Sequence, residues 1–181
     1  MTLRDDICLT GPRVLLRPLR EDDAEAMFSY ARDPEVTRFL PWEPAPTLES
    51  VRPFLAEQMA RRRAGESLSL AIVLRESEQM IGSTDLMDLS HPRPAQAELG
   101  YLLAHPYWGR GLMTEAAGLT TAYAFGALRL ARLIAYADAE NIGSRRVLEK
   151  IGMRAHGSEM RVVKNENRLY IRYEMGQVRM S

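Results

Sequence analysis

The 181-residue chain has little cysteine, little lysine and no long apolar run. Cys8 is the only cysteine, which excludes a disulfide within the chain and fits a reducing compartment. No apolar run reaches the ~18 residues of a membrane-spanning helix, and the N-terminus lacks a signal-peptide pattern. These absences predict a cytoplasmic protein without a membrane partner. Cys8 lies near the N-terminus and is expected to be inert.

Charge of either sign is also not in excess, because Lys+Arg and Asp+Glu are equal at 24 each. This balance predicts no general affinity for nucleic acid or anionic membranes, so a partner must be recognised locally. Lys occurs only at positions 150 and 164. The three histidines are scattered without metal-ligand spacing, which predicts surface or loop histidines, no metal site and no Ser-His-Asp triad.

Hydrophobic patterning predicts a mixed α/β chain without repeats. Residues 97–103 are almost wholly apolar and are expected to form a strand covered on both faces. We expect a broken connection over 34–46, a loop at Pro92 and Pro94, and a final hairpin turning across Asn165-Glu166-Asn167. The expected strands are 13–18, 68–74, 80–86, 97–103, 132–137, 154–163 and 168–175, and the expected helices are 21–31, one ending near Ala64 before Gly65, 114–127 and 142–151.

The segment from Glu98 to Ala116 carries the clearest functional pattern, a strand, a glycine loop and a helix. Gly109 and Gly111 leave the backbone bare just before the helix, and bare amides at a helix N-terminus form an anion site. Thr114 stands where a dinucleotide fingerprint needs a third glycine, and no Gly-Lys-Ser/Thr of a P-loop occurs. The segment therefore predicts a bound phosphate or pyrophosphate, with Arg110 adding charge, although an ordinary strand-to-helix turn has the same glycines.

A second segment, Asn141-Ile142-Gly143-Ser144-Arg145-Arg146-Val147-Leu148-Glu149-Lys150-Ile151-Gly152, is typical of a short capped helix. Together with Tyr107-Trp108-Gly109-Arg110-Gly111-Leu112-Met113-Thr114-Glu115-Ala116, it resembles the GNAT superfamily of acyl-CoA-dependent N-acetyltransferases. The pattern is similar to the branch that includes ribosomal-protein N-terminal acetyltransferases, and Val14-Leu15-Leu16-Arg17-Pro18-Leu19 and Asp22-Asp23-Ala24 match that branch as well.

The resemblance implies one domain over 1–181 with a core of about 12–175. The implied fold is a mixed, mostly antiparallel sheet, flanked by about four helices, whose fourth and fifth strands splay apart to admit the pantetheine arm of acetyl-CoA. The resemblance assigns the main chain of Leu102, Leu103 and Ala104 to pantetheine, and Asn141 to the reactive end of the cofactor. The amides expected to hold the pyrophosphate are those of Gly109, Arg110, Gly111, Leu112, Met113 and Thr114.

The glycine loop departs from the broad superfamily pattern at its first position, Trp108, and at its last position, Met113. Met113 is bulkier than the usual Gly or Ala, so we expect its side chain to narrow the approach to the diphosphate. The position of the usual acid Tyr is Leu148. Ser144 lies on the apolar face of its helix, so it is a candidate proton donor to the departing sulfur and a further cofactor contact. The alternative for Ser144 is a hydrogen bond to the preceding turn.

Glu98 is the candidate base or substrate clamp, because a carboxylate in a covered strand is costly unless it is paired or hydrated. The alternative is a structural ion pair with an Arg. Glu115 is expected to stabilise the start of its helix. Phe39, Trp42 and Phe54 either line an acceptor groove or pack the first helices.

These residues predict an acetyl-CoA-dependent N-acetyltransferase that works by direct attack in a ternary complex. A protein N-terminal amine, such as that of a ribosomal protein, is the leading acceptor. An α-amine has a pKa of ~8 and is partly neutral at pH 7, whereas Lys, with a pKa of ~10.4, needs a stronger base than the sequence shows. Small amines such as drugs or polyamines are the alternative acceptors. A non-catalytic acyl-CoA-binding module is an alternative of another class. The patterns leave open whether the protein is a monomer or a dimer.

Overall fold

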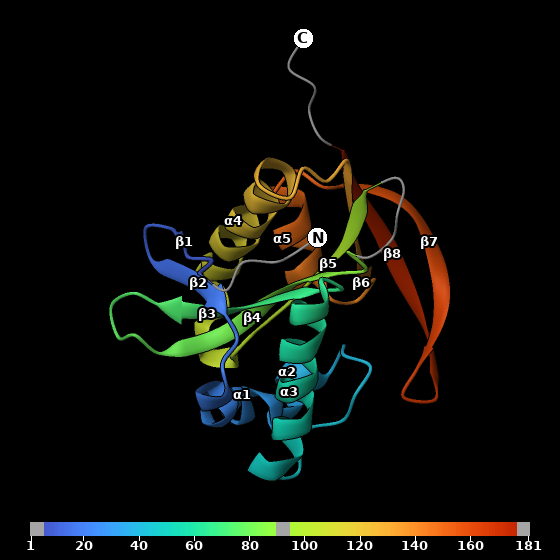
Figure 1. Cartoon of the computed structure of the whole chain (residues 1–181). Coiled ribbons are helices and arrows are strands. Elements are labelled where there is room, and N and C mark those ends of the chain that lie inside the picture. Colours follow the sequence, from blue (N-terminus) through green and yellow to red (C-terminus); the bar gives the residue numbers. More distant parts are fainter. Residues whose placement is uncertain (1–5, 90–94, 177–181) are drawn as a thin grey trace.

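The structure is a computed structural model that describes residues 6–89 and 95–176. Its framework is one eight-stranded sheet in the order β1-β2-β3-β4-β5-β6-β8-β7, shown in Figure 1. Neighbouring strands are antiparallel except β5 and β6, which are parallel. The strands are β1 (Leu9–Thr10), β2 (Val14–Pro18), β3 (Leu68–Leu74), β4 (Met80–Met87), β5 (Gln96–Leu103), β6 (Arg132–Asp138), β7 (Arg154–Val163) and β8 (Glu166–Gly176).

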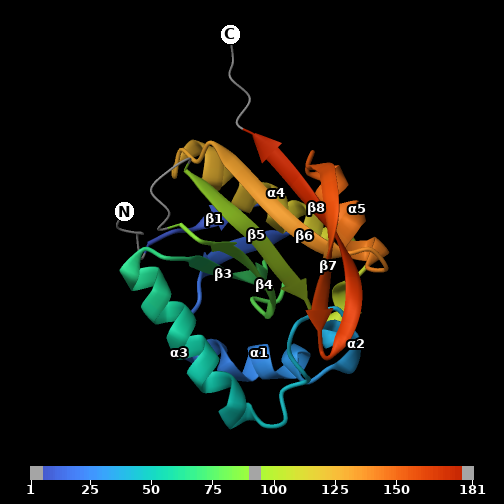
Figure 2. The same ribbon diagram turned by 90° about the vertical axis from the view of Figure 1, so that its right-hand side faces the viewer.

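Helices cover both faces of this sheet, as Figure 2 shows. One core layer joins α4 and α5 to the sheet, and a second joins α1, α2 and α3 to the opposite face. No helix of the described part is long and apolar enough to cross a membrane. The helices are α1 (Ala24–Ala31), α2 (Pro34–Thr37), α3 (Leu48–Ala64), α4 (Leu112–Gly126) and α5 (Ile142–Lys150).

The ends of the helices follow from local capping. Thr47 caps α3 by accepting the Ser50 N–H at 3.3 Å, and Gly65 ends that helix in the left-handed region at φ +74°. The Asn141 side chain caps α5 in the same way. The expected helix over 21–31 begins instead with a 3₁₀ turn, because the Asp23 carboxylate folds back onto the Arg20 N–H at 2.8 Å.

Three further expectations are corrected by the structure. The final hairpin does not turn across Asn165-Glu166-Asn167 as expected. It turns at Lys164 and Asn165, both at positive φ, because Val163 already pairs with Glu166. The connection over 34–46 contains α2, which starts at a proline that needs no amide partner there. The edge strand β1 was not expected. The expected loop at Pro92 and Pro94 lies outside the described residues.

The most consequential feature of the sheet is the brief pairing of β5 with β6. Only Gln96–Glu98 of β5 pairs with Arg132–Ile134 of β6, after which β6 continues along β8. The fourth and fifth strands expected from the sequence, 97–103 and 132–137, are β5 and β6, so the expected splay is confirmed. β5 is not covered on both faces as expected: Leu99 and Leu103 are buried, but Glu98 and Gly100 are half-buried and face a cavity.

Gly82 on β4 provides a test of the packing of β4 against β5. A Cβ at Gly82 would lie 2.3 Å from the Leu102 carbonyl oxygen and 3.0 Å from the Leu103 Cα, both of which are main-chain atoms that cannot rotate away. We expect Gly82→Ala to lower the free energy of unfolding by about 1–3 kcal/mol. Gly118→Ala in α4, where a Cβ meets nothing within 4 Å, should raise it by about 1 kcal/mol. Urea unfolding of both variants measures this, and equal effects would contradict the close approach.

Candidate active site

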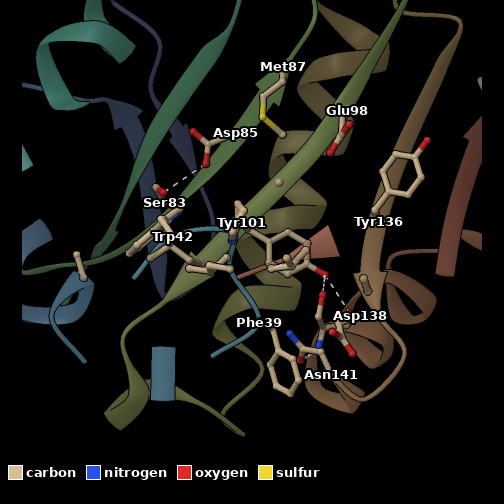
Figure 3. Close-up of a pocket in the computed structure, with 18 of the residues that line it drawn as sticks. Phe39, Trp42, Ser83, Asp85, Met87, Glu98, Tyr101, Tyr136, Asp138 and Asn141 are labelled. Atoms are coloured by element: carbon tan, nitrogen blue, oxygen red, sulfur yellow. Dashed lines mark hydrogen bonds between the residues drawn. The ribbon is translucent and has the colours of Figure 1, made fainter. Parts of the chain in front are cut away.

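A cavity of about 920 Å³ occupies the gap where β5 and β6 diverge. Its wall includes β5 and β6 themselves, so the cavity connects the face under α1 and α3 with the face under α5. Figure 3 shows Asp85 and Glu98 on neighbouring strands of its wall, with Met87 between them. From α5 the wall receives Asn141, Ser144 and Leu148. The divergence of two strands thus opens a passage through the sheet.

The start of α4 presents main-chain amides beyond the end of β5. Gly109 and Gly111 have φ of +71° and +75°, a conformation that L side chains rarely adopt, so the loop requires glycine at both positions. The first amides of an α-helix have no acceptor within the helix, and no side chain caps this one. Arg110 is exposed beside the loop. The geometry suits the predicted anion site.

Met113 does not narrow the approach to these amides, contrary to the expectation from its size. Its side chain is 7% exposed and packs in the core between α4 and the sheet. Met113 contributes only its main chain to the surface of the loop, so its departure from the family pattern is a difference in core packing.

Glu115 fastens the start of α4 to the beginning of β2. Its carboxylate accepts hydrogen bonds from the Arg13 N–H at 2.7 Å, the Arg13 guanidinium at 2.8 Å and the Val14 N–H at 3.1 Å. Burial opposes ionisation of Glu115, but these hydrogen bonds outweigh burial and lower its pKa. Its position beside β2 indicates a structural role, as expected.

The main chain of β5 alternates in direction between β4 and the gap. The Ala104 N–H donates to the Ile81 carbonyl at 2.8 Å, and Leu102 pairs with Ser83 in the same register. In an antiparallel ladder the intervening residues, Tyr101 and Leu103, direct their N–H and C=O the other way. The Leu103 carbonyl accepts the Trp108 indole N–H at 2.7 Å.

Ser144 lies at the α5 side of the gap. Its Oγ is 3.1 Å from the Tyr101 hydroxyl, which also donates to the Ser144 carbonyl at 3.0 Å (Figure 3). Asn141 accepts the Ser144 N–H at 3.0 Å and thereby fixes the first turn of α5. The predicted apolar face of α5 is present, with Leu148 1% exposed. The sequence did not single out Tyr101, whose side chain reaches from β5 to α5.

Glu98 is half-buried on the cavity wall. Burial raises its pKa; the charge of Arg161 lowers it, and the charges of Asp88 and Glu159 raise it further. Within residues 6–89 and 95–176 no cation forms an ion pair with Glu98, so the structure does not contain the structural ion pair that was the alternative. The carboxylate faces the cavity at the point where β5 leaves β6.

Asp85 is a second carboxylate of the cavity that the sequence reasoning missed. Asp85 lies on β4 opposite Gly100. Because Gly100 has no side chain, the Asp85 carboxylate is open to the cavity. Burial raises the pKa of Asp85 to about 6, although hydrogen bonds from Ser69 and Ser83 oppose the shift. Alternation along the predicted strand 80–86 places Ser83 and Asp85 on one face. The pairing of Asp85 with Gly100 and of Met87 with Glu98 shows that Glu98 shares this face.

The loop after α2 closes one side of the cavity. Phe39, Trp42 and Phe54 all line the cavity, and Trp42 also packs against the core of α1 and α3. Contacts with the β7–β8 hairpin hold α2 and this loop in place: Lys164 Nζ donates to the Thr37 carbonyl at 3.0 Å and lies 3.6 Å from the Glu43 carboxylate. The Tyr170 hydroxyl donates to the Phe39 carbonyl at 3.2 Å. The aromatic wall is therefore built from segments far apart in the chain.

A passage through an open sheet, with a glycine loop and helix start beside it, is the arrangement that the GNAT resemblance implies for an acyl-CoA-dependent transferase. A family model described as acetyltransferase (GNAT) domain matches residues 13–154. The chain belongs to this family and is a GNAT-type acetyl-CoA N-acetyltransferase.

Similar proteins agree with this assignment. The probable N-acetyltransferase YjcK of Bacillus subtilis is 32% identical over 160 residues, covering 86% of this chain and 88% of that protein. The spermidine N(1)-acetyltransferase of Escherichia coli is 26% identical over 81% of this chain and 76% of its own length. The structure of Mycobacterium smegmatis RimJ in complex with CoA-disulfide is 26% identical with a TM-score of 0.80, covering 91% of this chain and 82% of that one. Ribosomal-protein alanine and serine acetyltransferases are also structural neighbours.

The raised pKa of Asp85 predicts a pH-dependent cost to stability. Its pKa rises from 3.8 to about 6, so the native state holds the proton more tightly than the unfolded chain between these values. The free energy of unfolding must therefore fall as pH rises through this window. We expect Asp85→Asn to be more stable than wild type at pH 8 by about 1–3 kcal/mol, and the advantage to vanish below about pH 4.

Chemical unfolding at several pH values measures this difference. Asp22→Asn makes the same change of charge at an exposed position and should alter stability little at any pH. A constant difference between Asp85→Asn and wild type from pH 4 to pH 8 would contradict a raised pKa at Asp85.

Proposed function

We propose that this enzyme acetylates the α-amine at the N-terminus of a protein, by direct attack on acetyl-CoA in a ternary complex. The observation that carries the proposal is the cavity through the sheet, which lets a cofactor held at the α4 side meet an acceptor held beside Glu98. Two substrates bound from opposite faces at one gap need no covalent enzyme intermediate, because binding alone brings the reacting atoms together.

The residues at the α4 side fit a CoA diphosphate. The amides of Gly109, Arg110, Gly111, Leu112, Met113 and Thr114 are available at the start of α4, where the helix dipole favours an anion. Both glycines have the conformation that such a loop requires, and the Arg110 guanidinium adds positive charge. RimJ, with CoA-disulfide bound, has the same fold at 26% identity, which supports the same placement.

Within the gap, pantetheine would run along β5 as an additional strand. Of the assigned residues Leu102, Leu103 and Ala104, only Leu103 directs its main-chain groups into the gap, and Tyr101 does so as well. The Leu103 carbonyl is already bonded to Trp108, so its N–H is the remaining group. Asn141 and Ser144 stand at the opposite wall, on α5.

The reaction forms a C–N bond and breaks the C–S bond of the thioester. Glu98, directly or through water, accepts the proton that the amine nitrogen loses. Ser144, whose hydroxyl is paired with that of Tyr101, supplies a proton to the departing sulfur. The Tyr101 hydroxyl is bonded to both the Oγ and the carbonyl of Ser144, and it thereby holds the orientation of Ser144. The position of the family's usual acid is Leu148.

A protein N-terminus suits the acceptor side for two reasons. An α-amine titrates near ~8, so a carboxylate of modest basicity such as Glu98 suffices to complete its deprotonation. The aromatic side chains of Phe39, Trp42 and Phe54 provide apolar surface for the first residue or residues of a chain. Structural neighbours titled ribosomal-protein acetyltransferases, at identities of 15–19%, share the fold.

A small polyamine is the second candidate acceptor. The specific observation in its favour is that two carboxylates, Asp85 and Glu98, face one cavity without an ion-pair partner among the described residues. A sequence relative is named spermidine N(1)-acetyltransferase, which is consistent with such an acceptor.

An acceptor panel tests the proposed function. Purified protein is incubated with acetyl-CoA and either short peptides with free N-termini, the same peptides with blocked N-termini and one Lys, or alkyl polyamines, and CoA release is followed. We expect the free α-amines to be acetylated fastest. A protein that binds CoA but releases none with any amine would be a binding module, and faster turnover of polyamines would establish the second candidate.

Glu98→Gln tests the assignment of the base. Removal of a general base typically lowers kcat about 10²-fold to 10⁴-fold. With an α-amine acceptor the loss should be greatest at pH 6 and shrink toward pH 9, because the amine then deprotonates in solution. The measurement is kcat against pH at saturating acetyl-CoA, with Glu76→Gln in the exposed turn after β3 as the matched control. A loss that is constant across pH would instead assign Glu98 to substrate positioning.

A further inference from the structure

Asp85 and Tyr30 line a part of the cavity that the proposed reaction does not use. Asp85 stands on β4, one strand further from the β5–β6 gap than Glu98. Tyr30 approaches from α1, is 2% exposed and lines the same cavity. Its hydroxyl oxygen is buried without a hydrogen-bond partner. A buried hydroxyl that bonds to nothing costs stability, so its retention in a cavity wall points to a ligand group that completes it.

The described residues supply no cation that pairs with Asp85 in this part of the cavity. Among residues 6–89 and 95–176, no Lys, Arg or His forms an ion pair with Asp85. The two arginines of the cavity wall are engaged elsewhere: Arg61 lies 3.8 Å from the Glu66 carboxylate, and Arg161 lies 2.6 Å from the Glu159 carboxylate. Arg161 is also stacked 3.7 Å above the Tyr136 ring. Among the described residues, Asp85 therefore has no positively charged partner.

The local groups match an ammonium ion. An ammonium has three N–H donors and no acceptor. Here it meets the Asp85 carboxylate and the Tyr30 hydroxyl oxygen, and the Ser83 hydroxyl lies 3.4 Å from Asp85. The negative charge of Asp85 is close enough to Tyr30 to raise the pKa of its hydroxyl, after the larger effect of burial. An anion or a neutral apolar group would leave the buried negative charge of Asp85 uncompensated.

We infer that Asp85 and Tyr30 form a subsite for a second ammonium group of the acceptor, beside the amine that is acetylated at the gap. This inference rests on the proposed function and narrows its substrate class to acceptors with two positive groups. Adjacent strands lie ~4.8 Å apart, so a group over β4 is roughly one to two strand spacings from the gap. A diamine spans that distance, and so does a peptide with Lys as its first or second residue.

Calorimetric titration of the CoA-saturated protein tests the subsite independently of turnover. Cadaverine and n-pentylamine have the same carbon chain and differ only in the second ammonium group. We expect wild type to bind cadaverine about tenfold to hundredfold more tightly, the value of one charge-assisted hydrogen-bonded pair. A dipeptide amide Ala-Lys against Ala-norleucine repeats the comparison for a peptide acceptor. The pair that shows the preference identifies the source of the second ammonium.

Three variants assign the preference to these residues. Asp85→Asn should abolish it while n-pentylamine binds as before, and Tyr30→Phe, which removes only the hydroxyl, should reduce it. Asp22→Asn removes one exposed acidic charge and should retain the full preference. Circular dichroism confirms that each variant is folded.

The inference is overturned if neither dicationic ligand binds more tightly than its monocationic partner, or if Asp85→Asn retains the preference. It is also overturned if Asp85→Asn lowers kcat equally for cadaverine and n-pentylamine, because Asp85 would then be a base. A failure of the proposed function has a different signature, the absence of CoA release with every amine, and leaves the calorimetric comparison intact.

Discussion

The structure depends on the short parallel pairing of β5 with β6. Three residues of each strand pair, and beyond Ile134 the ladder of β6 continues only with β8. Main-chain groups of Tyr101 and Leu103 are then left without a neighbouring strand, and a sheet interior that leaves such groups unpaired is costly. The Trp108 indole satisfies one of them. A CoA arm lying along β5, as we propose, would satisfy others.

The two cores are arranged around this gap. One core packs α4 and α5 against the sheet and fixes the glycine loop through Glu115. The other packs α1 and α3 against the opposite face, where the aromatic loop and the two carboxylates lie. The proposed cofactor side and the proposed acceptor side are thus opposite faces of the sheet. Burial in this cavity raises the pKa values of Asp85 and Glu98, because it disfavours their charged forms. The cationic acceptor that we propose would offset this cost.

Much of the fold could be predicted from the sequence, because alternation and capping are local. The strands 68–74 and 154–163, the end of α3 at Gly65 and the Asn141 cap were all read from neighbouring residues. The family resemblance supplied the splay, which periodicity does not show. Asp85 and Tyr30 were missed because their role depends on two strands and a helix meeting in space. Tyr101 was missed because a tyrosine in an apolar strand has the pattern of a core residue.

The central claim is that cofactor and acceptor meet at the β5–β6 gap from opposite faces of the sheet. A crystal structure of the protein with CoA tests it most directly. We expect the diphosphate on the amides of residues 109–114, and the thiol sulfur inside the gap, between β5 and Ser144. A diphosphate bound away from the start of α4, or a thiol that remains outside the sheet, would contradict it.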